Sequence, residues 1–561
     1  MQISAPNIEP TNRVLKTRKT TRAIAGIFAA FAMCAAILPL QTAAQTGGAY
    51  KVTNLISDGS VPANVTDPTF INPWAISDRG TWWMSTQGSG QNFVVSSTAA
   101  VLGTISFRVV VPPASGLTTS NGFPAGSVTT GGAVGMLLPN GTKASFLFST
   151  LDGTISGWNS KLGTAGAISQ AAINNSAAGA SYPGLAILNT ATASYILAAN
   201  FGTGNAIEVY DSTFKPTTLA GKFTDPGLPT GYAPFSVHVL NNQIYVAYAL
   251  RSATAPYRTV DAVDNGAVDI FDVNGNLVSR AATKGNLNSP WGVAIAPANF
   301  GIFGGSLLIG NFGNGLIHAY DPKTFDYRGE LVDGTGKPLS YASLWELLPG
   351  GTAVGGTSAV SGGDTSTVYF TAGLTGEVHG LFAAIANDTT TTGTPSYGFS
   401  AAANALTVAN GSSVPTIISV APTYSFNGVI KLACSGLPSG ASCSFTPSQI
   451  TASATAPSTA ILTIQTSKTM ALLQPTGHGV GGVAVAVLLP FASVLVFYRR
   501  RSSALTGLLG LFVLSGIMFA AFGAIMGCGA ASSTPAGTSQ VIVTATSGSI
   551  TQSTTIALTA Q

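Results

Sequence analysis

Short apolar runs separated by Gly- and Asn-rich turns recur along most of this 561-residue chain. The stretch NFGTGNAIEVYD at 200–211 matches NFGNGLIHAYD at 311–321, and a third copy ends GAVDIFD at 266–272. Apolar and polar residues alternate in these copies, which is typical of a strand with one buried face. A repeat of about 50 residues is typical of solenoids and propellers.

Six segments share one order of events: a Pro- or Gly-led apolar strand, a second apolar strand, a tight turn and a third strand. Their first-strand markers are Trp74, Gly135, Gly184, Phe235, Trp291 and Trp345. This spacing predicts a six-bladed β-propeller over 50–386, because each small sheet buries its faces only against neighbouring sheets. We expect the early strand at 50–56 to complete the last blade beside 377–382, which protects a bare edge.

Further short strands follow the Thr-rich stretch 387–396, which has the composition of a linker. Their regular spacing predicts the first part of an Ig-like β-sandwich over 397–470. Cys434 and Cys443 lie close together there, and a disulfide is expected if the domain is exported; two free buried thiols are the alternative.

Two apolar runs interrupt this domain, at 479–498 and 505–526, and each approaches the length that spans a bilayer. Arg499, Arg500 and Arg501 lie between the runs, which predicts a two-helix transmembrane hairpin with its turn in the cytoplasm. The strands at 536–561 would then form a C-terminal β-hairpin that completes the sandwich. A sorting tail at 480–501 and a lipoprotein cleavage box ending at Cys528 are the alternatives. The expected fold class is therefore all-β, with a propeller, a sandwich and this inserted membrane hairpin.

The first 44 residues have the three parts of a secretory signal peptide. A basic stretch from Arg13 to Arg22 precedes an apolar run at 23–40, and small residues at 42–44 favour cleavage after Ala44. An uncleaved membrane anchor is the alternative. The net charge of +4 comes largely from this leader and the triple Arg, so no basic face is visible and no nucleic-acid partner is expected.

The stretch from Ser289 to Asp321 resembles NHL repeats, and 50–386 resembles an uncharacterised family of exported bacterial β-propeller proteins. Recurring phrases carry the second resemblance: NPW at 72–74, LDGTISGWN at 151–159 and LNSPWG at 287–292. The stretch 426–447 is similar to a bacterial Ig-like repeat. These resemblances imply the fold and an exported location, and they imply no reaction.

Few residues carry recognisable chemistry. The chain has four His, and it lacks the nucleophile-elbow, phosphate-loop and HExxH motifs. Asn72, Asn288 and Glu346 lie beside the first-strand tryptophans and are the candidate ligand or metal residues. Gluconolactonase-type propellers, which the architecture resembles, hold a divalent cation near the axis with such ligands, and hard oxygen ligands suit calcium.

A second candidate is a column of polar residues at one position of the third strands. It comprises Ser156, Glu208, Asp269, His318 and His379. Such a column would line a groove or bind metal, but period-two alternation predicts more simply that these side chains face solvent.

These observations favour a membrane-anchored binding or cell-envelope interaction module outside the cytoplasm, with an envelope glycan or protein as partner and with no predicted cofactor. A metal-dependent lactonase-like or other hydrolytic propeller is one alternative. A purely structural envelope protein is the other.

Overall fold

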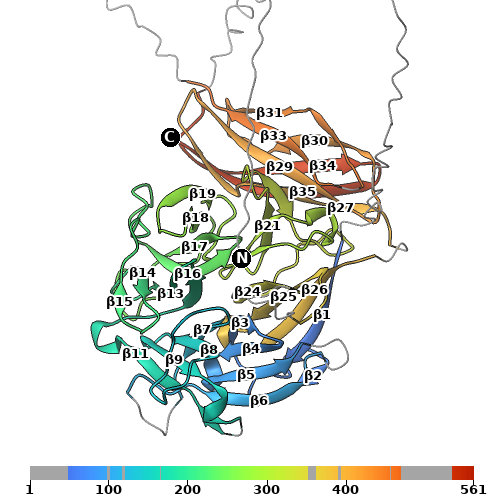
Figure 1. The fold of residues 1–561 in the computed structure, drawn as a ribbon. Helices are drawn as coiled ribbons and strands as arrows, with labels where there is room; N and C mark the ends of the chain where they lie inside the picture. The colour runs from blue at the N-terminus through green and yellow to red at the C-terminus, as the bar shows by residue number, and fades with distance from the viewer. Residues whose placement is uncertain are drawn as a thin grey trace, which may run out of the picture. The chain divides into compact units, whose positions relative to one another are not determined.

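The computed structural model describes residues 49–97, 102–115, 121–164, 166–351, 362–389, 393–454, 456–468 and 533–561. These residues form eight separate β-sheets (Figure 1). Five 3₁₀ turns of three residues each connect strands: η1 (Gln87–Ser89), η3 (Ser160–Leu162), η4 (Ser176–Ala178), η5 (Gly301–Phe303) and η6 (Thr375–Glu377).

Six of the sheets arise from residues between Tyr50 and Asn387 and form a β-propeller-like region. Two of them have five strands. One has the order β3 (Pro73–Asp78), β4 (Thr81–Thr86), β5 (Gln91–Ser96), β6 (Ile105–Val110), β10 (Ala167–Ile168). The other has the order β24 (Leu344–Pro349), β25 (Thr367–Ala372), β26 (Leu381–Asn387), β1 (Tyr50–Ser57), β2 (Val65–Thr66). The other four sheets have four strands each. The first has the order β7 (Pro124–Thr129), β8 (Phe146–Thr150), β9 (Thr154–Trp158), β11 (Gln170–Asn174). The second has the order β12 (Gly184–Asn189), β13 (Ser194–Asn200), β14 (Ala206–Tyr210), β15 (Pro216–Thr217). The third has the order β16 (Tyr232–Leu240), β17 (Gln243–Leu250), β18 (Ala267–Phe271), β19 (Leu277–Thr283). The fourth has the order β20 (Pro290–Ile295), β21 (Leu307–Asn311), β22 (Ile317–Tyr320), β23 (Tyr327–Glu330).

The six sheets pack side by side through the first strand of each. The first strands contact one another in the order β3, β7, β12, β16, β20, β24, and β24 also contacts β3. Apolar side chains fill the spaces between neighbouring sheets, as in the cluster that joins Leu185 and Ile187 to Leu147 and Ile155. β1 pairs antiparallel with β26, which overlaps the expected partner segment 377–382 only at Leu381 and Phe382.

The other two sheets pack face to face as a sandwich. One has the order β27 (Ser396–Ala401), β29 (Ser413–Thr423), β33 (Ser458–Gln465), β31 (Ser442–Thr446). The other has the order β28 (Ala405–Val408), β35 (Ile550–Ala560), β34 (Gly537–Ser547), β30 (Val429–Ser435), β32 (Gln449–Thr451). One apolar core joins them, and the C-terminal strands supply Val541, Val543, Ile556 and Leu558 to it.

A disulfide between Cys434 and Cys443 links the two sandwich sheets, since Cys434 lies on β30 and Cys443 lies on β31. The two Cα atoms are 6.7 Å apart. The linked residues are nine apart in the sequence, so the bond closes a short loop between the sheets.

The described residues are all-β, as the sequence predicts, but the closed propeller and the membrane hairpin of the predicted fold class are wrong. The described strands form eight separate sheets of unequal strand number, rather than one closed, regular six-bladed propeller. The expected transmembrane hairpin at 479–498 and 505–526 lies outside the described residues, and within the described ranges no helix is long and apolar enough to cross a membrane. The expected signal peptide at 1–44 also lies outside the described residues.

Candidate functional site

The loop between β13 and β14 organises a network of polar side chains. Asn200, the last residue of β13, accepts hydrogen bonds at Oδ1 from the backbone N–H groups of Ser181 (3.2 Å) and Gly202 (2.9 Å). Its Nδ2 donates to Oε1 of Glu208 on β14 at 2.6 Å. The Asn-x-Gly-x-Gly motif therefore holds a carboxylate in a fixed place beside the turn.

Two tyrosines hold the other carboxylate oxygen. The hydroxyls of Tyr182 and Tyr210 donate to Glu208 Oε2 at 2.6 and 2.5 Å. Nδ2 of Asn175 donates in turn to both hydroxyl oxygens, at 2.8 and 2.6 Å. Burial, followed by these hydrogen bonds to Glu208, raises the pKa of Tyr182 and Tyr210 well above the usual tyrosine value, so both remain protonated donors.

Every donor in this network is neutral. The part of the chain that the structure describes places no Lys, Arg or His nitrogen within 4.0 Å of the Glu208 carboxylate. Three hydrogen bonds occupy most of the acceptor capacity of a carboxylate, which has about four lone-pair sites. The site therefore presents one oriented negative charge with room for one further donor.

A pocket of about 420 Å³ opens over this carboxylate. Its walls are mainly apolar, and the lining residues are Asn175, Ile207, Glu208, Val209, Tyr210, Pro216, Thr217, Thr218, Leu219, Lys222 and Phe223. Lys222 and Phe223 have φ of 56° and 52°, in the left-handed region that such side chains rarely adopt. Strained backbone of this kind clusters at ligand-binding positions.

The other members of the polar column are engaged in separate contacts. Ser156 bonds to Ser169 at 2.8 Å, Asp269 pairs with Arg280 at 2.8 Å, and His379 pairs with Asp58 at 2.7 Å. Ser156, Asp269 and His318 are at most 1 % exposed, so the expectation that the column faces solvent is wrong for them. The sheets are packed on both faces, so period-two alternation does not leave one face in water.

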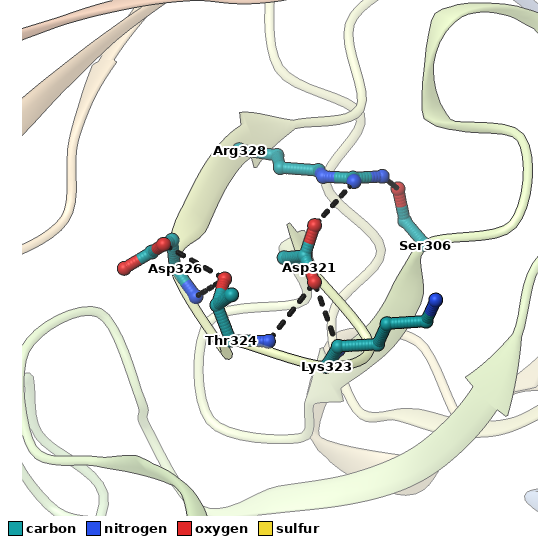
Figure 2. A network of polar contacts seen from close by, with 6 residues as sticks. All are labelled: Ser306, Asp321, Lys323, Thr324, Asp326 and Arg328. Carbon is teal, nitrogen blue, oxygen red and sulfur yellow. Dashed lines mark hydrogen bonds and ion pairs between the residues drawn. The ribbon is translucent and has the colours of Figure 1, made fainter. Parts of the chain in front are cut away.

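The aromatic-Asp ending of the third strands has a structural role. Oδ1 of Asp321 accepts the backbone N–H groups of Lys323 (2.8 Å) and Thr324 (3.0 Å), and its Oδ2 accepts Arg328 Nη2 at 2.6 Å (Figure 2). Oδ1 of Asp211 and of Asp272 accepts backbone N–H groups of the following turn in the same way. These aspartates stabilise turns and leave Glu208 as the functional candidate of the repeat.

Three tryptophans meet where the first strands converge. Trp74 and Trp345 stack with ring centroids 3.4 Å apart, and Trp291 meets them edge-on at 6.3 and 6.0 Å. Phe235 joins the same buried cluster. Bulges interrupt five of the six first-strand pairings near these residues, and bulges re-aim side chains in this way.

Asn72 and Asn288 are held by different partners beside this cluster. Oδ1 of Asn72 accepts Trp345 Nε1 at 2.9 Å, and its Nδ2 donates to Gln87 (3.0 Å) and Glu377 (2.8 Å). The backbone carbonyl of Asn288 accepts a hydrogen bond from the N–H group of Gly313 at 3.0 Å. A Cβ added at Gly313 would lie 2.0 Å from Asn288 Oδ1, so the two residues pack closely.

Glu346 faces a histidine that sequence reasoning left out. Its Oε1 accepts Leu347 N–H at 3.1 Å and lies 3.8 Å from His238 Nδ1. The Trp291 carbonyl, 3.1 Å from His238 Nε2, can only accept, so Nε2 carries the hydrogen. Burial raises the pKa of Glu346 to about 8 and lowers that of His238 to about 4. No motif in the sequence marks His238, because His238 on β16 and Glu346 on β24 are far apart in the sequence and meet only in the folded chain.

A metal centre is not formed by these candidates in the described residues. Among those residues, no group of three or more His, Cys, Asp or Glu side chains is placed to hold one metal ion. The side chains of Asn72 and Glu346 are used in separate contacts, and the hydrogen bond of Asn288 described above is made by its backbone.

No protein-family model matches the chain. Two uncharacterized proteins of Acanthamoeba polyphaga mimivirus are each 27% identical to it; one match covers 60% of this chain and 80% of the relative, and the other covers 60% and 86%. Among solved structures, a Bacteroides caccae protein of unknown function matches at 11% identity with a TM-score of 0.30, covering 50% of this chain and 78% of that one. The PQQ-bound aldose sugar dehydrogenase of Streptomyces coelicolor matches at 10% identity with a TM-score of 0.34, covering 61% and 99%.

These findings correct several expectations drawn from the sequence. The relatives are viral, so the predicted membership of a bacterial family is wrong, and no family model supports the NHL-like or Ig-like resemblance. The structure also gives no support to a membrane anchor made of two C-terminal helices, since no spanning helix occurs in its described ranges. The predicted membrane partner and the predicted membrane-anchored location outside the cytoplasm depend on that anchor, and both are therefore without support.

Proposed function

We propose that this chain is a small-molecule-binding protein whose site is the Glu208 pocket. One observation carries the proposal: a carboxylate that has no cationic partner among the described residues is held by Asn200, Tyr182 and Tyr210 at a pocket with apolar walls. Ligand sites are usually concave and apolar with a few oriented polar groups, and this pocket has that composition. The polar groups are positioned in advance by their own hydrogen bonds, which lowers the entropic cost of binding.

The proposal is tested by screening neutral, cationic and anionic fragments against the full chain with ligand-observed NMR. Thr218 is exposed and lines the pocket, so Thr218→Trp fills it without touching the polar network. Thr192→Trp is the matched control, because Thr192 is exposed in the turn that joins β12 to β13 and lies outside the pocket. We expect fragments that bind the wild type and Thr192→Trp but not Thr218→Trp.

Absence of any bound fragment, or binding that Thr218→Trp leaves unchanged, would overturn this function and leave a purely structural protein. A metal-dependent lactonase-like activity stays a prediction from the sequence. It would require a divalent cation near Glu346, and no observation favours it over the Glu208 pocket.

A further inference from the structure

We propose that the ligand of the Glu208 pocket is an organic cation, an amine attached to an apolar body. This inference rests on the proposed binding function and specifies the ligand that the site selects. The argument begins with charge. Several carboxylates of the described chain have an arginine beside them: Asp269 and Asp225 share Arg280, and Asp67 pairs with Arg108.

Glu208 differs from these because the described groups that bond to its carboxylate are all neutral. Two tyrosine hydroxyls and one amide donate to its carboxylate, so the network orients the negative charge without cancelling it. A partly buried charge without a counter-ion is unfavourable, and an ammonium group supplies both the missing charge and a hydrogen for the remaining lone pair. A ligand with a carboxylate at this point of the pocket would be repelled by the negative charge of Glu208. Lys222 lines the same pocket, but it is exposed and makes no ion pair with Glu208.

The duplicated loop provides an internal comparison. His318 occupies the position of Glu208 in the second copy of the motif. Its side chain is fully buried and lies 3.5 Å from the Tyr327 hydroxyl, with no opening above it. The shared loop thus places a polar side chain at the same point of the strand in both copies, and only the copy with Glu208 opens into the pocket.

The walls determine the rest of the ligand. Ile207, Val209, Leu219 and Phe223 present hydrocarbon around the carboxylate. Burial of an apolar body against such walls contributes about 25 cal/mol for each Å² removed from water. A volume of about 420 Å³ suits a compact amine rather than a polymer.

The test uses three probes of equal length that differ only in the head group: hexylamine, hexan-1-ol and hexanoate. Each is titrated into the full chain by calorimetry at pH 7.5, where the amine is charged. We expect hexylamine to bind at least about tenfold more tightly than hexanol, and hexanoate more weakly than both. Glu208→Gln should reduce the affinity for hexylamine to that for hexanol and leave hexanol binding unchanged. Asp211→Asn removes the same charge from the neighbouring exposed turn and should change neither affinity.

Equal or tighter binding of hexanol or hexanoate by the wild type would overturn the cation assignment while leaving the binding function intact. A hexylamine preference that survives Glu208→Gln would overturn it as well. The wild-type comparison of the three probes remains decisive if Glu208→Gln fails to fold. Loss of all fragment binding, seen in the separate Thr218→Trp screen, would instead remove the binding function itself.

Discussion

Asn200 donates its side-chain amide to the Glu208 carboxylate at 2.6 Å, across the turn that joins β13 to β14. The approach depends on Gly204 within that turn. A Cβ built on Gly204 would lie 2.3 Å from Asn200 Nδ2 and 2.9 Å from Glu208 Oε1. A side chain therefore does not fit beside this hydrogen bond, and the second Gly of the motif leaves the room that it needs.

Gly204→Ala should break this contact. We expect a loss of about 1–3 kcal/mol in the free energy of unfolding, because buried Asn200 and partly buried Glu208 lose a charge-assisted hydrogen bond. Amine affinity should fall in parallel. Gly227→Ala is the control, since the nearest atom to its added Cβ is Asp225 Oδ1 at 3.3 Å. Chemical unfolding of the two variants checks the prediction, and equal stability of both would contradict it.

Glu346→Gln should change how stability depends on pH. The native carboxyl keeps its proton up to a pKa of about 8, whereas the value for an unburied glutamate is 4.5. The native state therefore binds more protons than the unfolded state between these values, so this group makes stability fall as pH rises. The variant lacks this contribution and should lose less stability between pH 5 and pH 8, by about 3–4 kcal/mol, because a difference of one bound proton changes the free energy of unfolding by about 1.4 kcal/mol for each pH unit.

Urea unfolding followed by tryptophan fluorescence at both pH values measures this difference near the tryptophan cluster. Asp326→Asn, at an exposed position, should follow the wild-type pH dependence. Identical pH dependence of Glu346→Gln and the wild type would show that the Glu346 carboxyl is not held neutral in the native state.

The sequence predicted the strands well, because period-two alternation and Gly/Asn turns are local properties. It also placed the early strand beside 377–382, and β1 pairs with β26, which begins at Leu381 near the end of that segment. It did not predict which side chains would be covered: Glu208 and His318 occupy the same position of one motif, yet only Glu208 lines a pocket. That difference depends on Tyr182, Asn175 and Phe223, which come from other strands and loops and share no spacing with the motif. His238 escaped notice for the same reason.

Cys434→Ser combined with Cys443→Ser should destabilise the sandwich by about 2 kcal/mol. The loop between the two cysteines is short, so its closure removes only a modest entropy from the unfolded chain. A reducing agent should lower the melting temperature of the wild type and leave that of the double variant unchanged. A wild-type melting temperature that does not respond to reduction would contradict the stabilising role.

Two adjacent residues of β34 test whether the C-terminal strands belong to the sandwich core. Val543 is 0% exposed and Ile542 is 42% exposed, because neighbouring residues of a strand point to opposite faces. Val543→Asp would bury an unpaired charge between the two sheets and should cost more than about 3 kcal/mol, whereas Ile542→Asp should cost less than about 1 kcal/mol. Limited proteolysis should therefore cleave the sandwich readily in Val543→Asp and slowly in Ile542→Asp. Equal protection of the two variants would mean that β34 packs outside the core in solution, and the expected completion of the sandwich by residues 536–561 would fail.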